Sequence, residues 1–400
     1  MAGGGYVGLS VAVAIRSAAP ALSVAVVDPQ PPQAVDRDTR CSAIAAAAVR
    51  LLGQLDIWRR VAADAQPINE MIITDSRLTD VMRPVFLTFA YDRADEAAVE
   101  PFAYMLPNRS LIRALRERAG ELGVELLTDA VAAFAAGPAA TDITLAGGGA
   151  RRARLLVAAD GVRSRLRDLA GIRTLHWPYG QTGIVVTVAH EREHHGRAEE
   201  HFLPAGPFAI LPLKGNRSSL VWTERDAEAQ RLMAADDLTF ELELEQRFGH
   251  HLGAISVEGP RRAFPLGLTL ARDYVAERLV LAGDAAHGMH PIAGQGLNIG
   301  FRDAAALAET VVEAHRLGLD IGSLAVLERY QRWRRFDTVR MGVATDVLNR
   351  LFSNDNPLLR VVRDVGLGLV DRMPGLKRRF IDQAAGEGRD TPRLLLGEAI

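Results

Sequence analysis

The feature that most constrains this chain is a glycine pattern at its start. Gly3, Gly5 and Gly8 form a G-x-G-x-x-G motif that opens a run of small apolar residues with helical spacing. A second apolar run, residues 22–27, ends in Asp28. Such glycines let a backbone approach a pyrophosphate, the helix N-terminus faces that anion, and an acid ending the next strand takes a ribose hydroxyl. The spacing therefore predicts a dinucleotide site in an α/β fold with a parallel sheet.

Two alternatives explain the same stretch without a ligand. A signal peptide is disfavoured because no basic region precedes the apolar run and glycines interrupt it. A glycine-rich turn with no ligand stays open. The motif normally follows a strand buried on both faces, and only Met1 and Ala2 precede Gly3. We therefore expect a further strand of about five to eight apolar residues ahead of Gly3 to improve stability and cofactor retention.

Composition excludes several classes of protein. The 400 residues carry 47 Lys+Arg against 49 Asp+Glu, which lacks the basic excess of a nucleic-acid binder. A single cysteine, Cys41, excludes a disulfide framework and a cysteine-ligated metal centre. His287 and His290 have no carboxylate or cysteine beside them at ligand spacing, so we expect loop hydrogen bonds and no metal. No apolar run reaches the ~18–20 residues that span a bilayer.

Hydrophobic periodicity divides the chain into helices and strands. It predicts helices at 38–57, 108–122, 237–248 and largely from 302 onward, and strands at 71–74, 85–91, 124–127, 155–159 and 278–283. Between residues 174 and 262, short alternating runs separated by turns predict an inserted antiparallel sheet. The expected domains are a discontinuous α/β domain (1–70, 100–173, 263–330), a sheet domain (71–99, 174–262) and a helical segment (331–400).

Two further motifs end predicted strands. Asp160-Gly161 by itself is an ordinary turn dipeptide. Gly283-Asp284 ends the strand at 278–283, and an acid at the carboxyl end of a strand can bind a polyol.

A loop rich in glycine and proline follows the second of these acids and leads into a helix that begins near Leu297. Its last residues, Gly294, Gln295 and Gly296, bring bare backbone N–H groups to a helix N-terminus. Such a place suits a developing anion.

In this order the motifs resemble those of the class A FAD-dependent aromatic monooxygenases with the para-hydroxybenzoate hydroxylase fold. Residues 290–303, HPIAGQGLNIGFRD, match the signature of the ubiquinone-biosynthesis hydroxylases (2-octaprenyl-6-methoxyphenol hydroxylase type) at every fixed position. Asp38-x-Arg40 and Asn108-Arg109 are supporting matches. The resemblance covers essentially the whole chain. It implies a Rossmann-like FAD-binding domain, an inserted antiparallel sheet for substrate and a helical C-terminus.

The resemblance also implies where FAD is held. The glycine motif would face the pyrophosphate, the acid of the second strand the adenosine ribose, and the Gly-Asp acid the ribityl chain. Two arginines would lie beside the flavin, the Asp-Gly motif would be shared with a pyridine nucleotide, and the loop before the helix would lie against the isoalloxazine ring. The expected contacts are Gly3, Gly5, Gly8, Asp28, Arg40, Arg109, Asp160, Asp284, Pro291, Gly294, Gln295, Gly296, Leu297 and Asn298.

The implied reaction is hydroxylation of the aromatic ring of a polyprenyl phenol in ubiquinone biosynthesis. Reduced FAD would react with O2 to give a C4a-hydroperoxide, whose distal oxygen passes to the ring, while the protein orients the substrate and excludes water. The reductant would be NAD(P)H or a separate electron-transfer protein. No side chain stands out as a catalytic base. Four side chains of the inserted sheet are expected to roof the pocket or else form plain core: Phe202, Phe208, Leu211 and Trp222.

Two other functions stay open. One is an NAD(P)H-dependent hydroxylase of a small soluble aromatic. The other is a flavin-poor scaffold subunit of a ubiquinone biosynthetic complex, and other enzymes of that pathway are expected partners of the preferred function as well.

The C-terminal segment has a basic bias. Residues 331–400 carry 13 Lys+Arg against 9 Asp+Glu, and apolar residues recur at helical spacing ahead of Lys377-Arg378-Arg379. A basic amphipathic helix over residues 358–380 would lie in a membrane interface or pack on the FAD domain. We expect a cytoplasmic protein with peripheral contact at the inner face of the membrane.

Overall fold

The computed structural model describes residues 1–75, 85–90, 101–288, 295–352 and 391–400. Its α/β part is built on a parallel sheet. The strand β1 (Ala25–Asp28) pairs with β7 (Glu125–Thr128), and β11 (Leu156–Ala158) pairs with β18 (Leu279–Leu281). Ala2 lies between these two pairs and bridges both in parallel, through Val27 and Ala158. Ala2, which directly precedes the glycine motif, thus joins the two halves of the sheet.

Helices cover this sheet and bury its apolar strands. The helix α1 (Tyr6–Ala18) packs against α4 (Asn108–Glu121) and α8 (Gln295–Arg316). Every residue of α1 from Gly8 to Ile15 is buried, because its small side chains allow close approach on all sides. Periodicity therefore correctly predicted the strands at 124–127 and 155–159 and the helix at 108–122.

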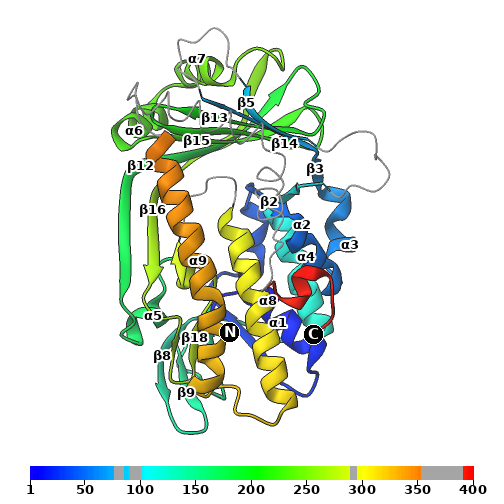
Figure 1. Cartoon of the computed structure of the whole chain (residues 1–400), viewed down its shortest axis with the longest axis vertical. Helices are drawn as coiled ribbons and strands as arrows, with labels where there is room; N and C mark the ends of the chain where they lie inside the picture. Colours follow the sequence, from blue (N-terminus) through cyan, green and yellow to red (C-terminus); the bar gives the residue numbers. More distant parts are fainter. Residues whose placement is uncertain (76–84, 91–100, 289–294, 353–390) are drawn as a thin grey trace.

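An eight-stranded sheet lies above the α/β part in Figure 1. Its neighbours are antiparallel apart from β13 and β4, which are parallel. The long β12 begins beside the α/β part and the antiparallel β16 ends there, so both strands extend from this sheet toward the α/β part. The expected boundary at residue 262 falls inside β16. In spatial order the strands are β19 (His287–Gly288), β16 (Ile255–Ala271), β12 (Thr174–His190), β15 (Arg217–Arg225), β14 (Gly206–Leu213), β13 (Arg197–Leu203), β4 (Glu70–Asp75) and β5 (Val85–Ala90).

One predicted helix is wrong in its first half. Cys41–Ala45 forms the strand β2, which pairs with β6 (Ala103–Pro107), and α2 (Ala46–Gln54) begins only afterwards. Alanine favours a helix locally, but pairing with β6 satisfies the backbone and buries Ile44 completely.

The sequence did not predict the hairpins over 131–153. The other described elements are η1 (Pro32–Arg37), α3 (Trp58–Val61), η2 (Ala62–Asp64), β3 (Gln66–Ile68), β8 (Val131–Ala136), β9 (Thr141–Leu145), β10 (Ala150–Ala153), α5 (Arg165–Leu169), β17 (Val275–Ala276), η4 (Gly283–Ala285) and η6 (Arg393–Leu396).

The eight-stranded sheet has two different faces. Its outer face is covered by α6 (Asp226–Ala234) and α7 (Asp237–Phe248), where Phe208 and Trp222 are fully buried against Phe240. Of the two alternatives for these aromatic residues, plain core is therefore correct and the pocket roof is not, because the period of two turns them away from the α/β part. Leu211 lies on the inner face.

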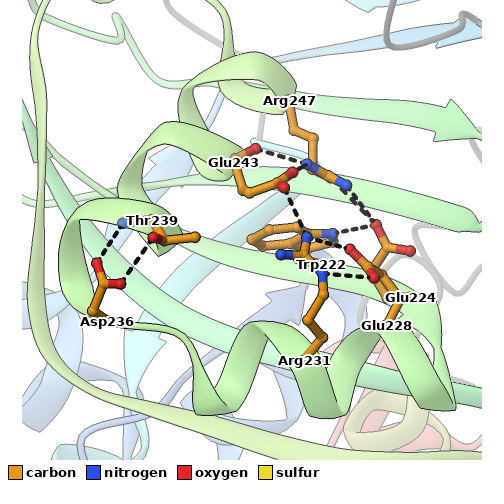
Figure 2. Close-up of polar contacts among 8 residues, drawn as sticks. All are labelled: Trp222, Glu224, Glu228, Arg231, Asp236, Thr239, Glu243 and Arg247. Carbon is orange, nitrogen blue, oxygen red and sulfur yellow. Dashed lines mark hydrogen bonds and ion pairs between the residues drawn. The ribbon is translucent and has the colours of Figure 1, made fainter.

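A polar network completes the outer face (Figure 2). The guanidinium of Arg247 lies 4.4 Å from the ring centroid of Trp222 and pairs with Glu224 at 3.0 Å and Glu243 at 2.9 Å. The side chain of Arg247 is only 4% exposed, so these carboxylates compensate a buried charge. Asp236 caps α7 by accepting from the backbone N–H of Thr239 at 2.8 Å, which explains why the predicted helix at 237–248 has the correct ends.

The long helix α9 (Leu324–Phe352) runs past the α/β part up to the sheet in Figure 1, contacting α8, β17, β16 and β14. Helices α8 and α9 confirm the helical prediction for residues from 302 to 352. The predicted amphipathic helix lies outside the described residues, which resume only at residues 391–400. Leu394 and Leu395 are buried against α2, and Arg50 donates to the carbonyl of Leu395 at 2.9 Å. No helix in the described part of the chain is long and apolar enough to cross a bilayer.

Candidate active site

The glycine motif has the shape of a cofactor cradle. A Cβ on Gly3 would lie 2.2 Å from the carbonyl oxygen of Ala159, and a Cβ on Gly8 would lie 2.0 Å from that of Gly3. Gly5 differs, because a Cβ there would meet no atom within 4 Å. Two glycines therefore allow close backbone packing, and the third leaves open space at the start of α1. Gly5 is also the N-cap of α1, with no side-chain cap and no acid in the first turn, so free N–H groups and a positive helix end face that space.

Asp28 supports this cradle from the end of β1. One of its carboxylate oxygens accepts from the backbone N–H of Gly4 and the other from that of Gln30 at 2.7 Å. The carboxylate is half-buried and orients the glycine turn. Its remaining lone pairs are those that the predicted ribose contact would use.

Asp284 lies at the end of the neighbouring strand, as predicted. It is exposed to solvent, yet enough protein surrounds its carboxyl group for burial to raise its pKa. Arg167 fixes the adjacent backbone by donating to the carbonyl of Ala285 at 3.1 Å. In the Asp-Gly motif, Asp160 accepts from the N–H of Leu166 at 3.4 Å and has a buried oxygen, Oδ1, with no partner among the described residues.

Arg40 is held at the cleft by a chain of hydrogen bonds. It makes a two-pronged contact with Asp38, at 2.8 Å from Nε and 2.7 Å from Nη2. The buried Asn108 donates to Asp38 at 3.4 Å and accepts from Ser42 at 2.8 Å. Burial opposes ionisation of Asp38, but the hydrogen bonds from Arg40 hold its pKa below the usual value. The hydrogen bonds to Asp38 thus hold the guanidinium of Arg40 in place, and it lines the same cavity as the exposed Arg109.

A cavity of about 370 Å³ lies where the inner face of the sheet meets the α/β part. Arg40 and Arg109 line it from one side, and Val185, Leu213 and Arg217 line it from the sheet. The lining thus combines apolar groups with an excess of cations over carboxylates, and the carboxylates include Asp38, which pairs with Arg40. The structure brings these two predicted arginines together here, whereas the glycine motif, Asp28 and Asp284 belong to the neighbouring cradle.

The loop before α8 is only partly described. Pro291 and Gly294 lie outside the described residues, and α8 begins at Gln295. Gly296 and Leu297 are half-buried in its first turn. Asn298 is buried, accepting from the N–H of Ala45 and donating to the carbonyl of Ala43, each at 2.9 Å. Its side chain thus anchors α8 to β2, which places the helix N-terminus beside the cleft.

The remaining reactive groups do not form a separate centre. Burial raises the pKa of Cys41 to about 11, so its thiol stays protonated and a poor nucleophile at neutral pH. No three His, Cys, Asp or Glu side chains within the described ranges are arranged to hold a metal.

Comparison with known proteins identifies the cofactor. The family described as an FAD binding domain matches residues 1–336. The chain belongs to this family. It is 47% identical to the ubiquinone hydroxylase UbiL of Rhodospirillum rubrum over 99% of this chain and 91% of that protein. It is 33% identical to the 3-demethoxyubiquinol 3-hydroxylase of Escherichia coli over 96% of this chain and 97% of that protein.

Solved structures agree on the fold. The p-nitrophenol 4-monooxygenase PnpA of Pseudomonas putida superimposes with a TM-score of 0.78 at 19% identity, with 97% of both chains covered. The predicted family, the para-hydroxybenzoate hydroxylase fold and the FAD cofactor are therefore confirmed. The chain is an FAD-dependent monooxygenase, which favours an enzyme over the flavin-poor scaffold.

Sequence reasoning missed three residues that shape this site. Arg167 and Asp303 stood in the motifs without an assigned role, and Arg334 lay in no motif. Their partners are far away in the sequence: Ala285 for Arg167, and Arg334 for Asp303. The one sequence signal for these three residues is a charged side chain at a helical position where the periodicity predicts a buried apolar one.

Proposed function

We propose that this FAD-dependent monooxygenase hydroxylates the aromatic ring of a polyprenyl phenol on the route to ubiquinone. The observation that carries the proposal is the match to two ubiquinone-pathway hydroxylases over nearly the whole chain. The cavity supports it, because apolar groups and an excess of cations over carboxylates in its lining suit a phenol that ionises as it reacts.

The residues of the chain would divide the work as follows. The open position at Gly5 and the free N–H groups of α1 would hold the pyrophosphate of FAD, Asp28 its ribose and Asp284 its ribityl chain. Arg40 and Arg109 would supply positive charge at the flavin side. When reduced, bound FAD supplies the activation of O2 that the ring hydroxylation needs. The inner face of the sheet would orient the phenol and keep water out.

The proposal is tested by lipid analysis of a deletion strain of the source organism. A prenyl phenol lacking one hydroxyl should accumulate, and the wild-type gene should restore ubiquinone while the Gly5→Ala gene restores less. Purified protein with a reductant, O2 and a short-chain prenyl phenol should yield a product heavier by one oxygen. Normal ubiquinone in the deletion strain, together with turnover of small soluble aromatics alone, would select the alternative hydroxylase.

The electron donor is proposed to be NAD(P)H or a separate electron-transfer protein. Anaerobic mixing with NADH or NADPH separates the two. Bleaching of the flavin absorbance within one turnover time indicates direct reduction, and no bleaching indicates a protein donor.

Peripheral membrane contact is proposed for the basic segment near Lys377. Deleting all of 357–400 would also remove the packed residues Leu394 and Leu395 and so confuse the result. Replacing Lys377, Arg378 and Arg379 by Gln leaves that packing in place. We expect the variant to float less with anionic liposomes than the wild type, and equal flotation would reject the idea.

A further inference from the structure

A fully buried set of charges joins helix α9 to the turn that carries Asp284. Asp303, on α8, is 0% exposed and accepts three hydrogen bonds: from the backbone N–H of Gly283 at 2.8 Å, from His287 Nε2 at 2.5 Å and from Arg334 Nε at 2.8 Å. Gly283 and His287 lie on either side of Asp284 in the chain. The carboxylate of Asp303 therefore holds the turn on both sides of Asp284.

The charge of Asp303 is compensated from α9. Arg334 is 2% exposed, and its Nη1 also donates to Asp337 at 2.8 Å, which accepts from Arg302 at 2.7 Å. Two acids and two arginines thus alternate along one path. Burial alone would raise the pKa of Asp303, but His287 and Arg334 hold it below its usual value. An ionised Asp303 keeps all its oxygen lone pairs available for these three donors.

The turn needs such support because its backbone is not a favoured one. Gly283 has a φ of +62°, a conformation that residues with a side chain rarely adopt, and η4 is only three residues long. Arg167 holds the carbonyl of Ala285, and Asp303 holds the N–H of Gly283. Loss of either contact would allow the turn to take other conformations.

We propose that Arg334 is a positioning residue for FAD, acting through Asp303 on the turn that carries Asp284. Removing its charge would leave the buried Asp303 with only His287 and the N–H of Gly283 among the donors described above, and a buried anion with fewer partners takes up a proton or draws in water. Asp303 would then hold the N–H of Gly283 less well, and Asp284 would lose its place. Helix α9, which supplies no expected FAD contact, becomes part of the FAD site. This inference goes beyond the proposed substrate and does not depend on it.

A purely structural role for Arg334 is the competing explanation, and the chain contains a matched control. Arg247 (Figure 2) is also on a helix, 4% exposed and paired with two carboxylates, Glu224 and Glu243. It lies on the outer face of the eight-stranded sheet, which faces away from the α/β part. Replacing each arginine by Met removes a buried charge that is paired with two carboxylates, but only Arg334 pairs with the carboxylate that holds the FAD turn.

The test compares Arg334→Met, Arg247→Met and Arg334→Lys as purified full-length proteins. FAD is removed, the melting temperature of each apoprotein is measured, and FAD is titrated back by flavin fluorescence. Visible circular dichroism of the bound flavin then reports its surroundings. We expect both Met variants to melt lower, and only Arg334→Met to bind FAD at least about tenfold more weakly, the loss of one modest contact, with an altered flavin spectrum. Lys, which keeps the charge, should restore part of the affinity.

The proposal is overturned if Arg334→Met and Arg247→Met bind FAD equally well and give the same flavin spectrum as the wild type. If Arg334→Met does not fold, Asp337→Asn decides, because it keeps Arg334 and Asp303 in place and removes the charge of the acid that Arg334 shares with Arg302. A weaker FAD affinity in Asp337→Asn supports the proposal, and wild-type affinity overturns it.

Discussion

Replacing Gly5 by Ala should separate cofactor binding from folding. Gly5 has φ −77° and ψ −173°, which any residue can adopt, and an added Cβ meets no protein atom within 4 Å. The apoprotein should therefore change in stability by no more than about 1 kcal/mol, the difference between Gly and Ala as an N-cap. The same Cβ would stand where the pyrophosphate approaches α1. Losing one charge-assisted hydrogen bond costs about 1.5–3 kcal/mol, or roughly a 10- to 150-fold weaker Kd.

Two other glycines act as references. An Ala at Gly8 would place its Cβ 2.0 Å from the carbonyl oxygen of Gly3, so the backbone must move and the apoprotein should lose about 1–3 kcal/mol. An Ala at the exposed Gly120 in α4 meets no atom within 4 Å and should gain up to about 1 kcal/mol of helix stability. Urea unfolding of each apoprotein and FAD titration by flavin fluorescence give both quantities. Wild-type FAD affinity in Gly5→Ala, or a loss of apoprotein stability as large as that of Gly8→Ala, would refute the reasoning.

Three further outcomes follow from the structure. Arg109→Ala removes an exposed cation at the cavity and should weaken FAD in a fluorescence titration while changing stability by less than about 0.5 kcal/mol. Phe208→Ala empties part of the outer core and should cost about 3–5 kcal/mol in urea unfolding, with FAD affinity unchanged. Burial opposes ionisation of Glu199, but His201 and His251 hold its pKa well below the usual 4.5. Since the folded pKa is the lower one, this stabilisation is complete above about pH 5 and fades as the pH falls. The stability gap between wild type and Glu199→Gln should therefore narrow from about pH 5 to about pH 3, and a gap that widens over that range would contradict it.

Much of the FAD cradle could be predicted from local sequence, because its geometry is local. A glycine at position 8 is required by the carbonyl of Gly3 nearby in the chain, and Asp28 bonds the N–H of Gly4 within the same strand–turn–helix unit. The ends of α7 followed from its own cap, Asp236. Gly3 is the exception, because the carbonyl that a Cβ there would meet belongs to Ala159, which is distant in the sequence.

The sheet faces, the strand β2 and the buried charges were decided by tertiary structure. Trp222 and Leu211 both looked suited to a pocket, and only the arrangement of α6 and α7 over one face sent Trp222 into the core. Cys41–Ala45 extends because β6 offers hydrogen bonds that an alanine-rich helix would otherwise make for itself.

The sequence by itself thus determined the cofactor class, the order of the motifs and the alternation of helices and strands, since these depend on backbone freedom and short-range periodicity. Tertiary structure alone decided that Arg334 compensates Asp303 and that Arg40 and Arg109 line one cavity. The physical reason is the cost of a buried charge, which is met by whichever side chain the fold brings within about 3 Å, however far away it lies in the sequence.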